Sequence, residues 1–340
     1  MKNNLPFVSA IIPCKNEEKF IGECLQSILN QDYPKDKIEV LIVDGRSQDR
    51  SREIVKGFTK RYKFIKLLDN AQEITPVALN IGIRESRGEY IFRLDAHSIY
   101  QKNYIKKCLE WLEKTKADCV GGVLETLPSK DGLAAKAISL VLSSPFGAGG
   151  STFRTKRKEG YTDTVPFGAW RKDIFKKVGL FNERLIRNQD IELNSRIKKA
   201  GGKIFITTEI ELSYFAPSTL KKLICQQFQN GLWNIYTQKI TPNSLKRRHF
   251  VPLFFVSGLL MSLFLAPFVF GARVFFALIA ASYLLMNLFF SLRISSQKGL
   301  KYLPILLLTF FTLHFSYGLG SIWGLVTFSK KKYFFLLCIF

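Results

Sequence analysis

Two acidic residues stand where short apolar runs of the sequence end. Asp44 closes the run Ile38–Asp44, and Asp95 directly follows Tyr90–Leu94. Parallel sheets bind ligands beyond the carboxyl ends of their strands, so we expect both carboxylates on one rim. Asp95 and His97 are separated by one residue, and in extended chain they point to the same side and can reach one cation. The spacing therefore indicates a polar rim that can hold a divalent ion.

The elements that position this rim follow from alternating apolar runs and helical patterns. Strands are expected over residues 7–13, 38–44, 64–68 and 90–94, and helices over 16–31, 49–62 and 75–85. Further helices are expected over 133–142, 171–178 and 188–199, with a long, basic, glycine-rich loop over 144–164. Strands joined through helices imply right-handed crossovers. The pattern predicts an α/β fold with a mostly parallel sheet flanked by helices.

The composition divides the chain into two very different parts. Of the 50 Lys and Arg residues, 43 precede residue 250, and so do all 27 acidic residues. The remaining part carries seven basic residues and no acid. This distribution excludes a disordered chain and a purely soluble enzyme. The six cysteines form no C-x-x-C pair and no metal-like spacing with the three histidines, which favours reduced thiols in the cytoplasm.

Three uncharged runs follow, over residues 250–270, 274–292 and 303–328. Each is about as long as the roughly 20 residues that cross a bilayer core. The basic stretch Lys246–His249 places the chain before the first span in the cytoplasm. The third span would export Lys330–Lys332, so a re-entrant helix remains an alternative for it.

These features predict three regions: a catalytic domain over 1–218, a basic amphipathic juxtamembrane segment over 219–249 and a transmembrane region over 250–340. The apolar stripe of the middle segment fits a helix in the membrane interface. A helix that faces the core of the catalytic domain fits it equally well.

Several motifs resemble glycosyltransferase family 2, whose members have the Rossmann-like GT-A fold. Pro13–Glu18 resembles its P-x-x-N-E-E opening, and matching strings follow in the family's order at 43–49, 78–82 and 88–97. The strings D-T-V-P-F-G-A-W, N-Q-D-I-E-L-N and N-G-L-W, at 163–170, 188–194 and 230–233, are similar to the succinoglycan-biosynthesis branch. The resemblance covers essentially the whole chain.

The resemblance implies a set of donor-binding residues. Backbone at Pro13 and the side chain of Glu17 are expected to border the nucleoside, and Asp44 to accept the imide N–H of uracil. Asp49 and Asn80 lie in the matched motifs and are further donor contacts. For Asp49 a helix N-cap is the alternative role, and for Glu17 an exposed acid in a first helical turn.

The family's usual metal motif is D-x-D, which holds Mg²⁺ or Mn²⁺ across the donor diphosphate. In this chain His97 replaces the second acid and Asp95 is retained. Imidazole suits Mn²⁺ better than Mg²⁺, so manganese is the favoured cofactor. His97 either ligates the metal directly or bonds to phosphate or water.

The resemblance also places Asp190 opposite the acceptor hydroxyl as general base, with an N-cap as its alternative role. Gln189 stands where the family commonly has glutamate. Arg154, with Lys156–Lys158 on the same loop, and Trp233 are candidate acceptor contacts. The arginine of the Q-x-x-R-W motif of processive synthases is missing near Trp233, which favours addition of a single sugar.

The predicted function is therefore an inverting, metal-dependent glycosyltransferase anchored in the plasma or inner membrane, with its catalytic domain in the cytoplasm. Its expected donor is a UDP-sugar and its acceptor a lipid-linked saccharide in exopolysaccharide or surface-glycan synthesis. The basic excess fits an anionic leaflet and a lipid diphosphate rather than nucleic acid. A polyprenyl-phosphate glycosyltransferase and a non-catalytic scaffold of a polysaccharide assembly complex remain alternatives.

Overall fold

The computed structural model describes residues 5–155 and 159–327. The chain forms two compact units, each built from two separate stretches. The first comprises Met1–Glu125 with Lys156–Tyr214, and the second Thr126–Thr155 with Phe215–Phe340. The division into three consecutive regions, at 1–218, 219–249 and 250–340, stays a prediction. Lys156, Arg157, Lys158 and the lysines at 330–332 lie outside the described residues.

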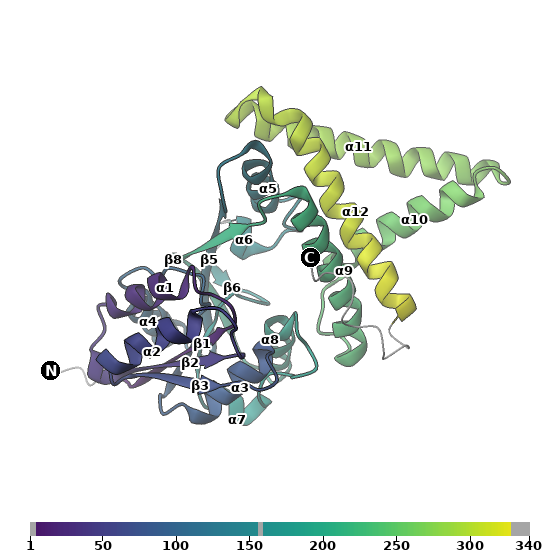
Figure 1. Cartoon of the computed structure of the whole chain (residues 1–340). Helices are drawn as coiled ribbons and strands as arrows, with labels where there is room; N and C mark the ends of the chain where they lie inside the picture. Colours follow the sequence, from purple (N-terminus) through teal and green to yellow (C-terminus); the bar gives the residue numbers. More distant parts are fainter. Residues whose placement is uncertain (1–4, 156–158, 328–340) are drawn as a thin grey trace. The chain divides into compact units, whose positions relative to one another are not determined.

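The sheet contains eight described strands in the order β3-β2-β1-β4-β7-β5-β8-β6 (Figure 1). Its strands are β1 Val8–Cys14, β2 Ile38–Asp44, β3 Ile65–Asp69, β4 Tyr90–Arg93, β5 Cys119–Pro128, β6 Gly160–Tyr161, β7 Ala169–Arg171 and β8 Ile204–Ala216. The run β3-β2-β1-β4 is parallel, whereas β7 is antiparallel to β4 and β5. The predicted α/β class is confirmed as a mixed sheet with a parallel half.

The parallel half is buried on both faces, which explains its unbroken apolar runs. Every residue of β2 is buried, and so are six of the seven residues of β1. The first unit contains α1 Ile21–Leu29, α2 Ser51–Arg61, α3 Thr75–Glu85, α4 Tyr104–Thr115, α7 Ile174–Val178 and α8 Gln189–Lys199. Gly82 lets α3 lie directly on β1, because a side chain there would overlap Ile11.

Two predicted helices begin later than expected. The segment before α1 is not helical because its backbone bonds elsewhere: the N–H groups of Asn16 and Glu17 donate to Ser47 Oγ and Ser51 Oγ at 2.9 and 2.7 Å. The helix expected from Arg171 begins at Ile174, since residues 169–171 pair with β4 as strand β7.

The second unit is helical and contains the apolar end of the chain. Its helices are α5 Leu133–Ser143, α6 Thr152–Thr155, α9 Leu220–Ile240, α10 Val251–Leu265, α11 Phe270–Lys298 and α12 Leu303–Thr327. Three helical stretches, Arg247–Leu265, Phe270–Lys298 and Leu300–Thr327, are long and apolar enough to cross a membrane. The third continues without a break through His314 and its glycines, so no broken helix is observed within Leu303–Thr327, and whether this span is re-entrant stays a prediction.

Helix α9 packs against α12, as Figure 1 shows. A side chain at Gly231 would overlap the carbonyl oxygen of Tyr317, and one at Gly320 would overlap that of Phe228. Small residues let helix backbones approach closely in this way. The Asn234 amide also donates to the Tyr317 hydroxyl. The third apolar helix therefore covers the part of α9 around Gly231 and Asn234, while the two alternatives for the apolar stripe stay predictions.

Candidate active site

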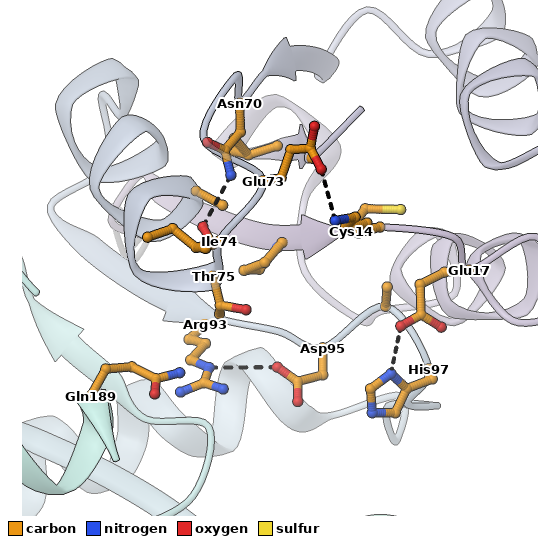
Figure 2. Close-up of a pocket in the computed structure, with 16 residues that line it drawn as sticks. Cys14, Glu17, Asn70, Glu73, Ile74, Thr75, Arg93, Asp95, His97 and Gln189 are labelled. Carbon is orange, nitrogen blue, oxygen red and sulfur yellow. Dashed lines mark hydrogen bonds and ion pairs between the residues drawn. The ribbon is translucent and has the colours of Figure 1, made fainter. Parts of the chain in front are cut away.

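A pocket of about 250 Å³ opens in the first unit, beyond the carboxyl ends of β1, β2 and β4. Its walls come from the segments that follow these strands, from the turn before α3 and from the start of α8 (Figure 2). The lining residues are Pro13, Cys14, Lys15, Glu17, Val43, Gly45, Asn70, Glu73, Ile74, Thr75, Ala78, Arg93, Asp95, Ala96, His97 and Gln189. Five of the predicted site residues meet here: Pro13, Glu17, Asp95, His97 and Gln189.

Asp95 lies on the pocket wall with its side chain 18% exposed. Its Oδ1 lies 3.5 Å from Nε of Arg93, and its backbone N–H donates to the Tyr100 hydroxyl at 2.7 Å. These contacts leave Oδ2 without a described partner, so the carboxylate can still accept a ligand. The predicted role as metal ligand is compatible with this arrangement and stays a prediction.

The His97 side chain is held by Glu17, the second predicted acidic residue that lines the pocket. Its Nδ1 lies 3.0 Å from Oε1 of Glu17. This hydrogen bond raises the pKa of His97, against the opposing effect of burial. Within residues 5–155 and 159–327, no three His, Cys, Asp or Glu side chains are arranged to hold a metal. A cation here would therefore take at most Asp95 and His97 from the protein.

Asp44 is only 1% exposed and does not line the pocket, although its neighbours Val43 and Gly45 do. Its Oδ1 accepts the Ser47 hydroxyl at 2.6 Å, and its Oδ2 accepts Nη1 of Arg52 at 2.6 Å. Arg52 also bonds Asp69 at 2.9 Å. A contact between Asp44 and the donor base stays a prediction, and it requires this cluster to open.

Asp49 joins two chain segments beside the pocket. Its carboxylate accepts the backbone N–H of Ser51 at 3.0 Å and that of Glu18 at 3.1 Å. It is not itself the N-cap of α2, which is Arg50, but it accepts an N–H at the start of that helix.

Asn80 is 1% exposed and holds the chain that leads toward α8. Its Nδ2 donates to the Phe181 carbonyl at 2.9 Å and to Glu183 Oε1 at 2.8 Å, while its Oδ1 accepts the Phe181 N–H at 2.9 Å. The amide is thus committed to protein groups. Its predicted contact with the donor is not tested by this geometry.

Gln189 and Asp190 lie at the start of α8, whose N-cap is Asn188. The N-cap alternative for Asp190 is therefore wrong, because the N-cap lies two residues before it and the helix begins at Gln189. Gln189 is buried against the pocket, and Asp190 is half-buried with Oδ1 accepting the Ile191 N–H at 2.9 Å. Glu192 instead braces the helix through Arg196 at 2.7 Å.

Asp95 and Asp190 act on the same buried arginine. Burial lowers the pKa of Arg93, but the charges of Asp95 and Asp190 more than offset it and raise that pKa above its usual value. Figure 2 shows Arg93 between Gln189 and Asp95. The two carboxylates expected to bind metal and to act as base therefore belong to one electrostatic cluster.

Four lining residues were not predicted from the sequence as site residues: Lys15, Asn70, Glu73 and Arg93. Lys15 Nζ lies 2.9 Å from Glu73 Oε2, and the Asn70 amide donates to the Ile74 carbonyl at 3.0 Å. Glu73 has φ 61°, in the left-handed region. Asn16 and Arg46, which directly follow the lining residues Lys15 and Gly45, also have φ in that region. Such backbone strain concentrates at functional sites, but it has no signal in a single sequence.

The remaining predicted contacts belong to the second unit. Nη1 of Arg154 lies 3.4 Å from Thr126 Oγ1. Trp233 is 4% exposed and lies beside Tyr236 on α9. Their roles toward an acceptor stay predictions.

Comparison with known proteins places the chain among glycosyltransferases. It is 32% identical over 233 residues, 66% of this chain and 72% of the relative, to dolichyl N-acetyl-alpha-D-glucosaminyl phosphate 3-beta-D-2,3-diacetamido-2,3-dideoxy-beta-D-glucuronosyltransferase of Methanococcus voltae. It is 30% identical to succinoglycan biosynthesis protein ExoA of Rhizobium meliloti, over 77% of this chain and 76% of ExoA. It is 29% identical to glycosyltransferase AglE of Haloferax volcanii, over 76% of this chain and 83% of AglE.

Solved structures share the fold at low sequence identity. Mannosyltransferase PcManGT from Pyrobaculum calidifontis, in complex with GDP-Man and Mn²⁺, has a TM-score of 0.59 at 18% identity, over 95% of this chain and 88% of that one. S. aureus TarS 1-349 in complex with UDP-GlcNAc has a TM-score of 0.52 at 15% identity, over 96% and 93%. The sequence profile of glycosyl transferase family 2 matches residues 9–179, half of the chain. Together with the Methanococcus relative, this match shows that the chain belongs to glycosyltransferase family 2.

Proposed function

We propose that this glycosyltransferase transfers a single sugar, with inversion, from a nucleotide-sugar donor to a lipid-linked saccharide. A UDP-sugar is the first donor to test, and synthesis of an exopolysaccharide or another surface glycan is the proposed context. The observation that carries the proposal is the pocket beyond the strand ends, where Asp95 and His97 share the lining with Gln189, the residue directly before Asp190 at the start of α8. This arrangement combines a group for the donor diphosphate with a carboxylate for the acceptor.

The nucleoside end of the donor would lie against Pro13 and Gly45, between Glu17 and Glu73. The diphosphate would extend toward Asp95 and His97, and the sugar toward Gln189. In this orientation the anomeric carbon faces the start of α8. Asp190 lies at that helix start.

The reaction that follows from this placement is a single displacement. The acceptor hydroxyl oxygen forms a bond to the anomeric carbon while the bond from that carbon to the diphosphate oxygen breaks on the opposite face. The hydroxyl proton passes to the Asp190 carboxylate, and the electron pair of the broken bond leaves with the nucleoside diphosphate. General-base assistance of this kind contributes roughly a hundred- to ten-thousandfold in rate.

A divalent cation fits the metal-binding side chains of the pocket, provided that it takes most of its ligands from phosphate and water. Asp95 and His97 would hold it, with His97 released from Glu17. Such an ion compensates the charge of the departing diphosphate. The imidazole favours Mn²⁺ over Mg²⁺. PcManGT, which shares the fold, is in complex with Mn²⁺, and this supports a divalent metal here.

The lipid-linked acceptor is proposed from the apolar helices and from the relatives. One relative is named for a dolichyl phosphate-linked sugar and another for succinoglycan biosynthesis. The helices at Arg247–Leu265, Phe270–Lys298 and Leu300–Thr327 would anchor the protein in the plasma or inner membrane. The basic residues at 246–248 would then keep the catalytic unit at the cytoplasmic face.

The test is sugar transfer by the full-length protein in detergent with Mn²⁺, using nucleotide sugars and two acceptors. One acceptor is a polyprenyl-diphosphate-linked saccharide and the other bare polyprenyl phosphate. Asp190→Asn should lose at least a hundredfold in kcat while nucleotide binding is unchanged. Asp131→Asn is the matched control, because the Asp131 side chain is 98% exposed in the other unit and should retain full activity.

The outcomes separate the alternatives. Full turnover by Asp190→Asn would remove Asp190 as base. Transfer to bare polyprenyl phosphate but not to the saccharide would replace the proposed acceptor with the lipid carrier itself. Failure of the wild-type protein to bind any nucleotide sugar with any divalent metal would leave the scaffold alternative.

A further inference from the structure

Arg93 is a buried cation whose hydrogen-bonding capacity is unused. The residue is 9% exposed and lines the pocket. Across the part of the chain that the structure describes, its Nε–H is completely buried and donates no hydrogen bond within normal geometry. The nearest anion is Asp95 Oδ1, 3.5 Å from Nε. Since a guanidinium carries five N–H donors, this is an unusual arrangement for a buried side chain.

The other basic side chains of the pocket differ in this respect. Lys15 Nζ lies 2.9 Å from a carboxylate oxygen of Glu73, and His97 Nδ1 lies 3.0 Å from one of Glu17. Both distances are those of hydrogen bonds. Arg93 therefore has the most donors available for a ligand among these three basic side chains.

An aromatic ring holds the guanidinium in place without using its donors. Cζ of Arg93 lies 5.5 Å from the centre of the Phe167 ring, within cation–π range. Phe167 belongs to the string D-T-V-P-F-G-A-W, to which the proposed function assigns no role. The contact orients the fork of N–H groups and leaves its edge accessible from the pocket.

The backbone at Phe167 is strained, and its surroundings fix it. Phe167 has φ 46°, which is rare for a bulky residue. Its carbonyl accepts the Tyr104 hydroxyl at 3.2 Å. The next carbonyl, that of Gly168, accepts the backbone N–H of Arg93 at 3.1 Å. Gly168 has no room for a side chain, which would lie 2.8 Å from Cys119 Sγ. The structure thus maintains a costly conformation that places an aromatic ring against Arg93.

We propose that Arg93 binds the diphosphate group of a substrate through its guanidinium fork, held in position by the ring of Phe167. The inference rests on the proposed function, which puts a nucleotide sugar in this pocket. A planar fork matches two phosphate oxygens, and these charge-assisted bonds are strong in a buried site. Arg93 thereby supplies part of the positive charge that a metal ion held by two acids would otherwise have to provide.

Two substrates carry such a group: the nucleotide donor and the lipid-linked acceptor. The lining favours the donor, because Arg93 shares the pocket with Pro13 and Gly45 at its nucleoside end. Calorimetry on the full-length protein in detergent distinguishes the sources. The probes are UDP, GDP and UMP for the donor, and farnesyl diphosphate for the acceptor lipid, each with and without Mn²⁺.

Arg93→Met should weaken the better-bound nucleoside diphosphate by roughly ten- to a hundredfold, the loss expected for a charge-assisted bond pair. Binding of UMP, which lacks the second phosphate, should change by less than about threefold. Arg93→Lys should lose most of the same affinity, because an ammonium cannot replace the fork. The matched control is Arg87→Met. Arg87 also stacks on an aromatic ring, Phe7 at 5.3 Å, but lies outside the pocket lining, so its loss should leave nucleotide affinity unchanged.

Phe167→Asn provides a second test that keeps the charge of Arg93. Asparagine tolerates the left-handed conformation, so the fold should be retained while the guanidinium loses its support. We expect several-fold weaker nucleoside diphosphate binding. If Arg93→Met has no cooperative thermal transition, this variant decides alone.

Each result has a distinct meaning. Unchanged affinity for nucleoside and farnesyl diphosphates in Arg93→Met overturns the inference. If Arg93→Met does not fold, the same result in Phe167→Asn overturns it. In either case, nucleoside diphosphate binding by the wild-type protein still supports the proposed function. Weaker farnesyl diphosphate binding with unchanged nucleotide binding supports a diphosphate contact to the acceptor. No binding of any nucleoside diphosphate by the wild-type protein overturns the proposed function, and the donor contact with it.

Discussion

Replacing Asn80 tests whether this residue contacts the donor or fixes the protein framework. The side chain makes three hydrogen bonds at 2.8–2.9 Å, two to the backbone of Phe181 and one to Glu183. In Asn80→Ala these bonds disappear, and the N–H and C=O of Phe181, a 3% exposed residue, lose their partner. If the framework role is correct, the main effect is on stability rather than on nucleotide affinity.

The magnitude follows from the two stranded backbone groups. Each buried, unsatisfied group costs about 1–3 kcal/mol, so Asn80→Ala should lose roughly 3 kcal/mol of unfolding free energy. For a unit of this size, each kcal/mol of lost stability lowers Tm by about 2–4 °C, so Tm should fall by roughly 6–12 °C. Asn80→Asp should cost at least as much, because it puts a carboxylate against Glu183 Oε1, 2.8 Å from the present amide nitrogen.

The assay pairs thermal unfolding of the purified protein with calorimetric titration of UDP well below Tm. Nucleotide affinity should stay within about twofold, since Asn80 does not line the pocket. Turnover should fall, because the released chain leads to Gln189 and Asp190. Asn30→Ala serves as control, since Asn30 is exposed and bonds only the neighbouring Gln26 side chain among its side-chain contacts. An unchanged Tm together with tenfold weaker UDP binding would refute the framework argument and restore the predicted donor contact.

Three further predictions concern other parts of the fold. Glu39 is completely buried, and hydrogen bonds from Ser9 and Arg87 hold its pKa below the usual 4.5 despite the opposing effect of burial. Glu39→Gln should therefore lose about 2 kcal/mol at pH 7. Because the folded-state pKa is depressed, the stabilisation is fully present above pH 4.5 and is lost as pH falls through the folded-state pKa, so the unfolding free energies of the two proteins should converge only below pH 4.5. Burial raises the pKa of Cys14 to about 12, with Asp44 adding to the effect, so N-ethylmaleimide at pH 7.5 should label Cys14 only after unfolding, as read by mass spectrometry. Gly320→Ala should lower Tm in detergent by several degrees because its side chain would overlap the Phe228 carbonyl, whereas Gly271→Ala, with open space around it, should not. Equal Tm values for the two glycine variants would contradict the close packing of α9 on α12.

Local patterning in the sequence was sufficient to predict the elements that line the parallel half of the fold. Strand β2 and helix α3 occupy the predicted residues 38–44 and 75–85. Strand β2 follows from a continuous apolar run, as expected for a strand that is covered on two faces. Helix α3 follows from a proline in its first turn, where the missing N–H is not needed. The three long apolar stretches were predictable for the same reason, since length and lack of charge are properties of the sequence itself.

Asp95 and His97 do line one pocket, as predicted, but the predicted reason was wrong: the segment is a turn, with the Ser98 N–H donating to the Asp95 carbonyl at 3.2 Å, and not extended chain. The sequence did not indicate which partner each side chain would take. Glu17 reaches His97 across 80 positions of sequence, and Arg52 neutralises Asp44. Such pairs depend on how crossovers bring chain segments together, which no local pattern encodes.

The tertiary structure alone decided the surroundings of Arg93. In the sequence Arg93 is one arginine among many basic residues, inside a short apolar run. Only the pairing of β4 with β7 brings Phe167 onto its guanidinium and opens its donors toward the pocket. Local hydrogen bonding and burial periodicity are set by neighbouring residues, whereas the chemistry of a buried charge is set by groups far away in the chain.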